Sequence, residues 1–398
     1  MRAQQASHWP STLGYFATFV VLGMTTASLG PTLPGLAEQA AAQLGAISYL
    51  FTSHSLGYMG GSFFGGRLYD RVPGHLVLAL MLALMAATLA LVPLIPVLWL
   101  LAVASMLLGV SGGALDVGGN TLLVWVHGRQ VGPYMNALHF FFGVGSFLIP
   151  IIVAQALALS GGIAWAYWVL ALLVLPVALW VARVPSPASP NDANSQAATE
   201  HQAGKEAQSE ADARWTVILI SLLLGLYVGA EAAFGGWIYT YAVALNLSDV
   251  TTAAYLTSAF WGALMVGRLL AIPLAARFRP RSILFVDLAG CMVSVGVLLL
   301  GSGSAAATWL GSMGLGLSMA SIFPTAISLA EHRIPITGQV TGWFLVSASI
   351  GGMLLPWLIG QLFEPVGPQV TMVAILLVLV AAMLAFLILV RVTRSWAV

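Results

Sequence analysis

The sequence is divided into about twelve apolar runs, each about as long as a helix needs to cross a bilayer. Glycine, proline and charged residues separate the runs. Only 7% of the residues are charged and 60% are hydrophobic, whereas soluble domains average about 25% charged residues. The pattern therefore predicts an all-α integral membrane protein with twelve transmembrane helices. We expect these helices near 12–33, 47–66, 75–93, 97–125, 133–157, 162–182, 215–241, 251–275, 282–301, 305–330, 337–361 and 368–391.

One long polar stretch interrupts the apolar pattern near the middle of the chain. Residues 184–213 are rich in Pro, Ala, Ser, Gln and charge, and they contain almost no bulky apolar side chain. Such a composition cannot bury a core and is typical of a flexible linker. The sequence therefore predicts two six-helix bundles, an N-terminal one over 1–183 and a C-terminal one over 214–398.

Basic residues predict how the helices are oriented in the membrane. The loops after the even-numbered runs carry Lys and Arg, and the alternate loops carry neither. Because basic loops stay in the cytoplasm, we expect a multi-pass protein of the plasma (inner) membrane with both termini and the linker cytoplasmic. The basic residues of these loops and tails are Arg2, Arg67, Arg71, Arg129, Arg183, Lys205, Arg214, Arg277, Arg279, Arg281, Arg333, Arg391 and Arg394.

Several landmarks recur in the two halves at a constant offset of 206 positions. Repeats of six spans in the same orientation are typical of transporters whose halves rock about a site near the membrane midplane. Chance alignment of glycine-rich helices is the competing explanation. The matched pairs are Tyr49 and Tyr255, Leu50 and Leu256, Gly61 and Gly267, Arg71 and Arg277, Gly132 and Gly338, Gly145 and Gly351, and Pro150 and Pro356.

The loop between the second and third runs, GGRLYDRVPGH at 65–75, resembles the loop signature of the major facilitator superfamily. Gly66, Asp70, Arg71 and Gly74 fit the signature, whereas His75 stands where a basic residue usually does. The resemblance implies a latch in which the aspartate caps a neighbouring helix and pairs with arginine when the cytoplasmic side is closed, which is physically reasonable for a carboxylate at a helix start. The alternative is that the arginine only follows the positive-inside rule.

Asp116 is the first of two acids deep inside apolar runs. A charge at the bilayer centre costs roughly 2.5–3.5 kcal/mol, so it must face a cavity or a partner. Asn120 follows four residues later and lies on the same helix face, and the glycines around the two residues let another helix or a ligand approach closely. We therefore expect Asp116 and Asn120 to form a polar wall of a central cavity. A buried Asp that only joins two helices is the alternative.

Glu231 is the second acid, in the stretch GLYVGAEAAFGGWIYTYAV at 225–243. Glycines interrupt the run around it, and interrupted helices are where transporter sites form. Trp237 follows and offers an aromatic face for a ligand, although Trp237, Tyr239 and Tyr241 could instead form an interfacial aromatic belt.

Two further ionisable residues lie within apolar runs. His139 could pair with Asp116 or line the site, and a packing role is its alternative. Arg268 is the only basic residue inside a run. We expect it to form a cytoplasmic-side ion pair with Asp287 or Glu331, with a role in gating.

Four segments together resemble one branch of the superfamily, the fucose permease and sodium-dependent glucose transporter-like sugar symporters. The resemblance implies that Asp116 takes part in ion coupling and sugar binding, and that Glu231 belongs to a motif of the seventh span. It also brings Asn120 and His139 into the site. An acid of fucose permease in the first span has no counterpart here, because Gly30 stands near that position. The segments are LGPTLPGLAEQ, GALDVGGNTLL, MNALHFFFGVGSFLIPII and LYVGAEAAFGGWIYTYA.

The resemblance and the residues together favour a secondary active transporter that imports a small polar solute, a monosaccharide, with H⁺ or Na⁺ coupled through Asp116 and Glu231. A sugar needs carboxylates, amides and an aromatic face. A proton-driven exporter of lipophilic compounds and a non-transporting sensor or scaffold are the alternatives. No nucleophile–base or metal constellation is visible, so we expect no enzyme and no cofactor. As partners we expect the bilayer and the solute, with no nucleic acid and no second subunit.

Overall fold

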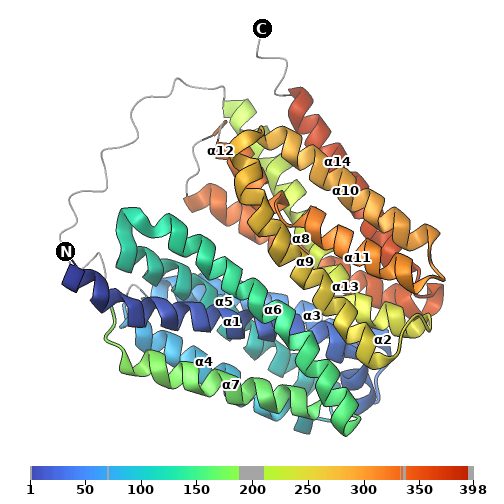
Figure 1. Cartoon of the computed structure of the whole chain (residues 1–398), viewed down its shortest axis with the longest axis horizontal. Coiled ribbons are helices and arrows are strands. Elements are labelled where there is room, and N and C mark those ends of the chain that lie inside the picture. The colour runs from blue at the N-terminus through green and yellow to red at the C-terminus, as the bar shows by residue number, and fades with distance from the viewer. Residues whose placement is uncertain (1, 70, 188–209, 332, 335–337, 393–398) are drawn as a thin grey trace.

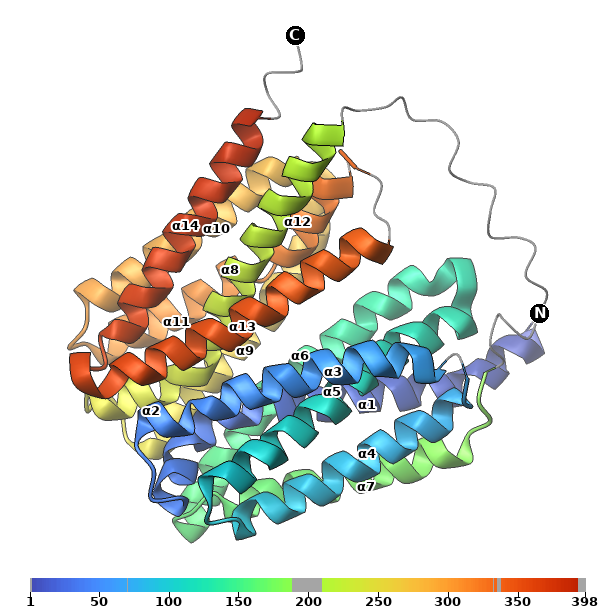
Figure 2. The same ribbon diagram turned by 180° about the vertical axis from the view of Figure 1, so that it is seen from behind.

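The chain forms two bundles of long helices, as Figure 1 and Figure 2 show from opposite sides. The computed structural model describes residues 2–69, 71–187, 210–331, 333–334 and 338–392. Helices α1 to α7 pack on one another in the first bundle, and α8 to α14 form the second. The helices are α1 (Arg2–Gln39), α2 (Leu44–Ile47), α3 (Tyr49–Tyr69), α4 (Gly74–Leu91), α5 (Leu98–His127), α6 (Val131–Ser160), α7 (Ala164–Arg183), α8 (Glu210–Ala244), α9 (Val250–Arg277), α10 (Pro280–Leu300), α11 (Ala305–Met319), α12 (Ile322–Glu331), α13 (Gly338–Val366) and α14 (Val370–Val392).

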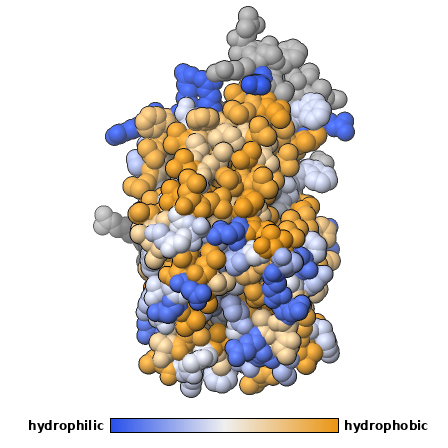
Figure 3. Space-filling model, turned by 90° about the vertical axis from the view of Figure 1, so that its right-hand side faces the viewer, coloured by the Kyte–Doolittle hydropathy of each residue, from blue (hydrophilic) through white to orange (hydrophobic). Residues whose placement is uncertain are grey.

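The predicted fold class, all-α with twelve spans in two bundles, is confirmed. Eleven spans among the described residues are long and apolar enough to cross a membrane. Helix α3, with 21 residues, also has the required length, although glycines and polar residues make it less apolar. Large apolar side chains are exposed on helices of both bundles, as expected for a surface that faces lipid. On the side of the molecule that Figure 3 shows, apolar residues are widespread with hydrophilic residues among them.

The helix boundaries differ from the predicted ones in three places. The tenth span is broken at 320–321 into α11 and α12, and a short helix, α2, precedes α3. Helix α8 begins at Glu210, inside the predicted linker. The central part of that linker, 188–209, lies outside the described residues.

Helices α3 and α5 of the first bundle touch backbone to backbone at glycines. A Cβ built on Gly61 would stand 2.0 Å from the Val110 carbonyl oxygen, and one on Gly109 would stand 2.1 Å from the His54 carbonyl oxygen. Only glycine permits such an approach, and small residues at a spacing of four are typical of membrane helix pairs. The four glycines of this contact are Gly57, Gly61, Gly109 and Gly113.

Equivalent close contacts occur in both bundles. A Cβ on Gly145 of α6 would stand 1.9 Å from the Val20 carbonyl oxygen of α1. A Cβ on Gly351 of α13 would stand 1.8 Å from the Gly225 carbonyl oxygen of α8. Since Gly145 and Gly351 are one of the pairs that recur at the offset of 206, this landmark of the repeat has a packing role in each half.

The two bundles touch mainly toward one end of the molecule. We call the end with the first turn of α1, the last turn of α7, the first turn of α8 and the last turn of α14 the terminal end, and the end with α2 the opposite end. The ribbons of the bundles diverge toward the terminal end (Figure 2). Contacts of α13 with α2 and α3, of α1 with α8, and of α6 with α9 join the bundles.

We predict that Gly61→Ala destabilises the protein and that Gly60→Ala does not. A Cβ on Gly61 would overlap the α5 backbone, whereas a Cβ on Gly60 meets nothing within 4 Å. Overpacking of this kind costs about 1–3 kcal/mol. The measurement is the thermal unfolding midpoint of each variant in detergent. Equal midpoints for the two variants would contradict the close contact.

Candidate functional site

Asp116 lies half-buried on α5, and both of its carboxylate oxygens accept hydrogen bonds. The Tyr58 hydroxyl of α3 donates to Oδ2 at 2.5 Å. The Asn120 side-chain amide donates to Oδ1 at 3.0 Å and also to the Asp116 backbone oxygen at 2.8 Å. The structure therefore brings Asp116 and Asn120 together as predicted, and it adds Tyr58.

The glycine contact between α3 and α5 places Tyr58. A Cβ on Gly113 would stand 2.1 Å from the Tyr58 carbonyl oxygen, so α3 runs directly over α5 at this level. One turn along α5, Asp116 then meets the Tyr58 hydroxyl. The sequence analysis missed this tyrosine, although Gly57 and Gly61 on either side of it mark a face that packs closely on a neighbour.

Glu231 of α8 is the corresponding acid of the second bundle, and it is also half-buried. The Tyr227 hydroxyl, one turn earlier on the same helix, donates a short hydrogen bond to Glu231 Oε2. Arg268 of α9 is near enough to Tyr227 to interact with it electrostatically. Each bundle thus presents one carboxylate that accepts a hydrogen bond from a tyrosine, and sequence reasoning missed both tyrosines.

His139 of α6 lies between these two groups. Its ring meets the Phe19 ring edge-on at a centroid distance of 5.7 Å, and its side chain is exposed. It is close enough to both Asp116 and Arg268 to interact electrostatically with each. The structure therefore connects the polar group of the first bundle with that of the second through His139.

Arg268 does not form the ion pair that the sequence suggested. Asp287 instead accepts a short hydrogen bond from the Ser321 hydroxyl, and Glu331 is exposed at the end of α12. Within the described part of the chain, Arg268 makes no ion pair with either acid. It is half-buried and lies near enough to His139 and Tyr227 to interact electrostatically with both.

Trp237 is fully buried at the contact between the bundles. Its indole N–H donates to the Pro356 carbonyl oxygen at 3.0 Å, and its ring stacks on Phe363 at a centroid distance of 5.0 Å. The ring of Phe51 of the first bundle also packs nearby, at a centroid distance of 6.2 Å. In this conformation the indole fills a bundle contact and presents no free face to a ligand.

Close packing between the bundles extends from the level next to the polar residues His139 and Arg268 to the opposite end. A Cβ on Gly30 would stand 2.4 Å from the Gly235 carbonyl oxygen, so α1 and α8 touch backbone to backbone. Gly143 of α6 lies against Met265 of α9, where a Cβ would come within 3.2 Å of Met265 Cγ. Farther along the same two helices, the Ser258 hydroxyl donates to the Phe147 carbonyl oxygen at 2.8 Å and Gln155 Nε2 donates to the Tyr255 hydroxyl at 2.5 Å.

The polar site begins one turn beyond this contact, toward the terminal end. His139 is one turn from Gly143 on α6, and Arg268 is one turn from Met265 on α9. His139 is itself exposed, so the close packing of the two helices does not extend over its side chain. Glu231 likewise lies one turn from Gly235 on α8, so the polar groups lie next to the level at which the close contact between the bundles ends.

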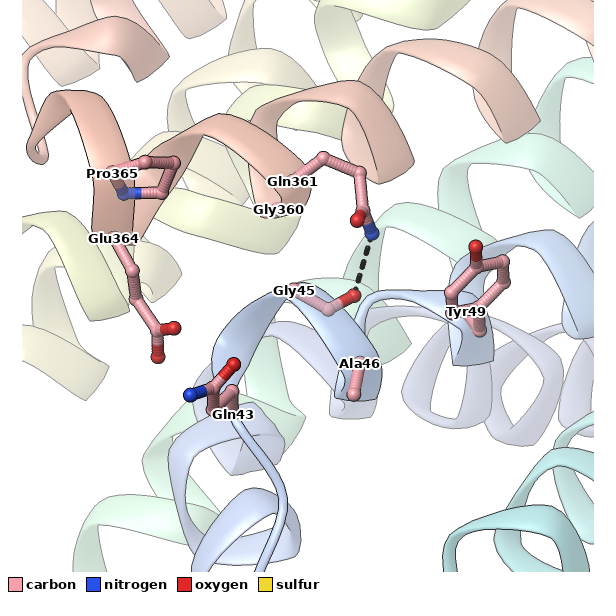
Figure 4. Close-up of a pocket in the computed structure, with 8 residues that line it drawn as sticks. All are labelled: Gln43, Gly45, Ala46, Tyr49, Gly360, Gln361, Glu364 and Pro365. Atoms are coloured by element: carbon pink, nitrogen blue, oxygen red, sulfur yellow. Dashed lines mark hydrogen bonds between the residues drawn. The ribbon is translucent and has the colours of Figure 1, made fainter.

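Among the described residues, four hydrogen bonds join α13 to α2 and to Ser48, which follows α2, and two of them involve α2 itself. The Leu44 backbone N–H, at the start of α2, donates to Glu364 Oε1 of α13 at 2.9 Å. Gln361 Nε2 of α13 donates to the Gly45 carbonyl oxygen at 2.7 Å (Figure 4). An acid of the second bundle thus satisfies an unpaired N–H of a helix in the first.

The predicted latch is only partly within the described residues. Gly66 lies near the end of α3 and Arg71 is exposed in the loop after it, whereas Asp70 lies outside the described residues. His75, which departs from the loop signature, is buried. Its ring nitrogens contact the Tyr15 hydroxyl at 2.7 Å and the Val184 carbonyl oxygen at 2.9 Å. At this position histidine therefore joins α4 to α1 and to the chain after α7.

Comparisons with known proteins agree with this architecture. The family model described as "Major Facilitator Superfamily" matches residues 15–356. The chain is 35% identical over 387 residues to "Sodium-dependent glucose transporter 1" of Danio rerio, covering 89% of this chain and 64% of that protein. It is 32% identical to the protein of the same name in Xenopus laevis, covering 85% of this chain and 73% of that protein. The chain spans less than two thirds of the length of the Danio rerio relative.

A solved structure, that of the "nucleoside transporter NupG", has the same fold. It superimposes with a TM-score of 0.75 at 14% identity and covers 97% of this chain and 99% of that one.

We predict that Glu364→Ala opens the opposite end. The change removes the acceptor of the Leu44 N–H, and the loss of about 1 kcal/mol expected for one such bond shifts the population about fivefold. The measurement is the pulsed electron spin resonance distance between labels at Leu94 and Leu300, which are 64% and 94% exposed at this end. The control is Glu38→Ala, which removes an exposed acid at the same end. Identical distance distributions for both variants would contradict the prediction.

Proposed function

Because the chain belongs to the major facilitator superfamily, we propose that it is a secondary active transporter that imports a monosaccharide together with H⁺ or Na⁺ by alternating access. In this proposal the terminal end faces the cytoplasm of a plasma (inner) membrane, and the conformation described above is open to the cytoplasm. The family is that of transporters and not of enzymes. Its sugar-transporting relatives support a small polar substrate.

The observation that carries this proposal is the position of the two tyrosine-bound acids. Asp116 belongs to the first bundle and Glu231 to the second, and His139 and Arg268 lie between them. A tilt of one bundle against the other about an axis away from the two carboxylates changes the distance between them. A solute that bridges them therefore binds differently in the two conformations, as alternating access requires.

The chemistry of these groups fits a polyol. Asp116 and Asn120 of α5, Tyr58 of α3, and Glu231 of α8 supply carboxylate, amide and phenol groups that can bind hydroxyls. The name shared by the two relatives in Danio rerio and Xenopus laevis, "Sodium-dependent glucose transporter 1", supports the choice of a hexose. We propose that Trp237 stacks on the sugar only in a state whose opposite end is open. In the conformation described above, its ring is fully buried.

Asp116 is the proposed coupling residue. Its hydrogen-bond donors, Tyr58 and Asn120, are neutral side chains, and a carboxylate at this depth is costly without a cation. A proton or a sodium ion that binds with the sugar would neutralise it. Glu231 is the second proposed coupling acid, and Arg268 with the loop residues Gly66, Asp70 and Arg71 is proposed to take part in gating.

The first experiment is uptake of labelled hexoses by proteoliposomes under an imposed pH gradient and, separately, a Na⁺ gradient. We expect saturable uptake of one hexose under one of the two gradients, and that gradient identifies the ion. Lack of hexose uptake under both gradients would refute the import of a monosaccharide. Drug resistance on expression would then favour a proton-driven exporter.

We predict that Asp116→Asn abolishes gradient-driven uptake but retains exchange of labelled for unlabelled hexose. Asparagine keeps the shape of the side chain and can still bind Tyr58, but it cannot gain or lose the charge that couples the ion. The measurement is uptake with and without the gradient. Asp249→Asn is the matched control, because Asp249 is an exposed acid that caps α9 and asparagine also caps helices well. Full gradient-driven uptake by Asp116→Asn would exclude the coupling role.

A further inference from the structure

A cavity of about 670 Å³ lies at the opposite end, outside the polar site between the bundles. Its walls come from both bundles (Figure 4): α2 and its flanking residues on one side, and the last two turns of α13 on the other. Ligand pockets for small molecules measure roughly 300–1,000 Å³, so the cavity has the size of a binding site. It is lined by Gln43, Gly45, Ala46, Tyr49, Gly360, Gln361, Glu364 and Pro365.

Several polar groups at this cavity keep unused hydrogen-bonding capacity. Glu364 uses Oε1 for the Leu44 N–H, which leaves Oε2 as an acceptor. Gln361 uses its Nε2 for Gly45 and Ser48, which leaves its Oε1. The Gln43 side chain makes no hydrogen bond with any residue that the structure describes. Although Gln43 directly precedes α2, its side chain does not cap that helix.

Tyr49 adds an aromatic face to this set. Its side chain is 48% exposed, and its ring leans on Trp357 at a centroid distance of 6.1 Å, which supports the ring from one side. Figure 4 shows Tyr49 on one side of the cavity and Glu364 with Gln43 on the other. Amide and carboxylate groups opposite an aromatic ring fit a neutral polyhydroxylated molecule, whereas the charge of Glu364 disfavours an anion.

We propose that this cavity is a second binding site for a neutral polyol of hexose size, and that its occupant stabilises the closed opposite end. The walls separate when the bundles part at this end, so the cavity is complete only in the closed state. A ligand that binds one of two states shifts the population toward that state. At ten times its dissociation constant the shift is roughly tenfold.

The proposal extends the proposed function, because it makes external sugar a regulator of the transporter as well as its cargo. After sugar is released to the cytoplasm, the opposite end must open again for the next molecule. Polyol in the cavity would slow that step. Uptake is therefore expected to fall at high external sugar concentration.

The test uses the full chain in nanodiscs with spin labels on Leu94→Cys and Leu300→Cys. The native thiol, Cys291, is buried and is replaced by alanine. At ten times its dissociation constant, we expect D-glucose to raise the ratio of the short-distance to the long-distance population roughly tenfold. The same response is expected in Asp116→Asn, whose coupling site is altered. No response to D-glucose in either protein would overturn the proposal.

Ala46→Phe is the decisive variant, because it places a large side chain in the cavity and removes none of the hydrogen bonds between the bundles. We expect it to lose the response to D-glucose. Ala306→Phe, at an exposed position at the start of α11, is the matched control and should respond like the parent. A response that survives in Ala46→Phe would place the effect elsewhere and overturn the proposal. If Ala46→Phe fails to fold, Gln43→Ala replaces it, with a severalfold weaker apparent affinity expected and an unchanged affinity counting against the site.

Two further comparisons distinguish a polyol site from a cation site and from an effect of transport itself. A shift produced by NaCl alone, with choline chloride as the reference, would assign the cavity to a cation and overturn the polyol site. Hexose uptake without any D-glucose effect on the labels would refute this inference and leave the proposed function intact. The reverse result, a D-glucose effect without uptake, would support the cavity and refute the transport of that sugar.

Discussion

Backbone contact at glycine is the interaction on which the rest of this structure depends. Lipid tails are as apolar as leucine, so helices in a bilayer gain little by burying apolar side chains and must gain by packing closely. In this protein α3 packs on α5, α1 on α6, and α8 on α13 at distances that no Cβ would allow. The first of these contacts also brings Tyr58 to Asp116. The glycine contact that holds α3 against α5 therefore also assembles the site.

The two acids are tolerated because each is hydrogen-bonded within its own bundle. Tyr58 donates to Asp116 and Tyr227 donates to Glu231, so neither acid depends on the other bundle for a partner. The contacts that do cross between bundles, such as Gly30 with Gly235, lie toward the opposite end. Separation of the bundles would thus break packing and leave the local hydrogen bonds of both acids in place.

The sequence predicts the spans and the two acids because hydropathy and isolated charges are properties of single segments. The partners of the acids need knowledge of which helices touch, and a tyrosine in an apolar run carries no charge to mark it. The buried position of Trp237 was equally hidden, since an indole near a helix end is typical of a membrane interface too. The break between α11 and α12 and the short α2 are set by tertiary packing, so span length alone could not reveal them. The local rule that did carry over was glycine as a mark of close approach: the sequence indicates it around Asp116, and Gly113 there packs against the Tyr58 carbonyl oxygen of α3.

The glycine contacts have a mechanical consequence. Helices whose backbones interlock cannot slide by a fraction of a turn, so each bundle is stiff, and compliance is concentrated where the bundles meet near α2 and α13. Helix α5, with 30 residues, is about 45 Å long at 1.5 Å per residue. A stiff body that tilts about a joint at one of its ends acts as a lever, and a tilt of a few degrees there displaces its far end by several ångströms. In the conformation described here the hydrogen-bonded patch around Glu364 and Gly45 holds the two levers together at the opposite end, and it must separate for that end to open.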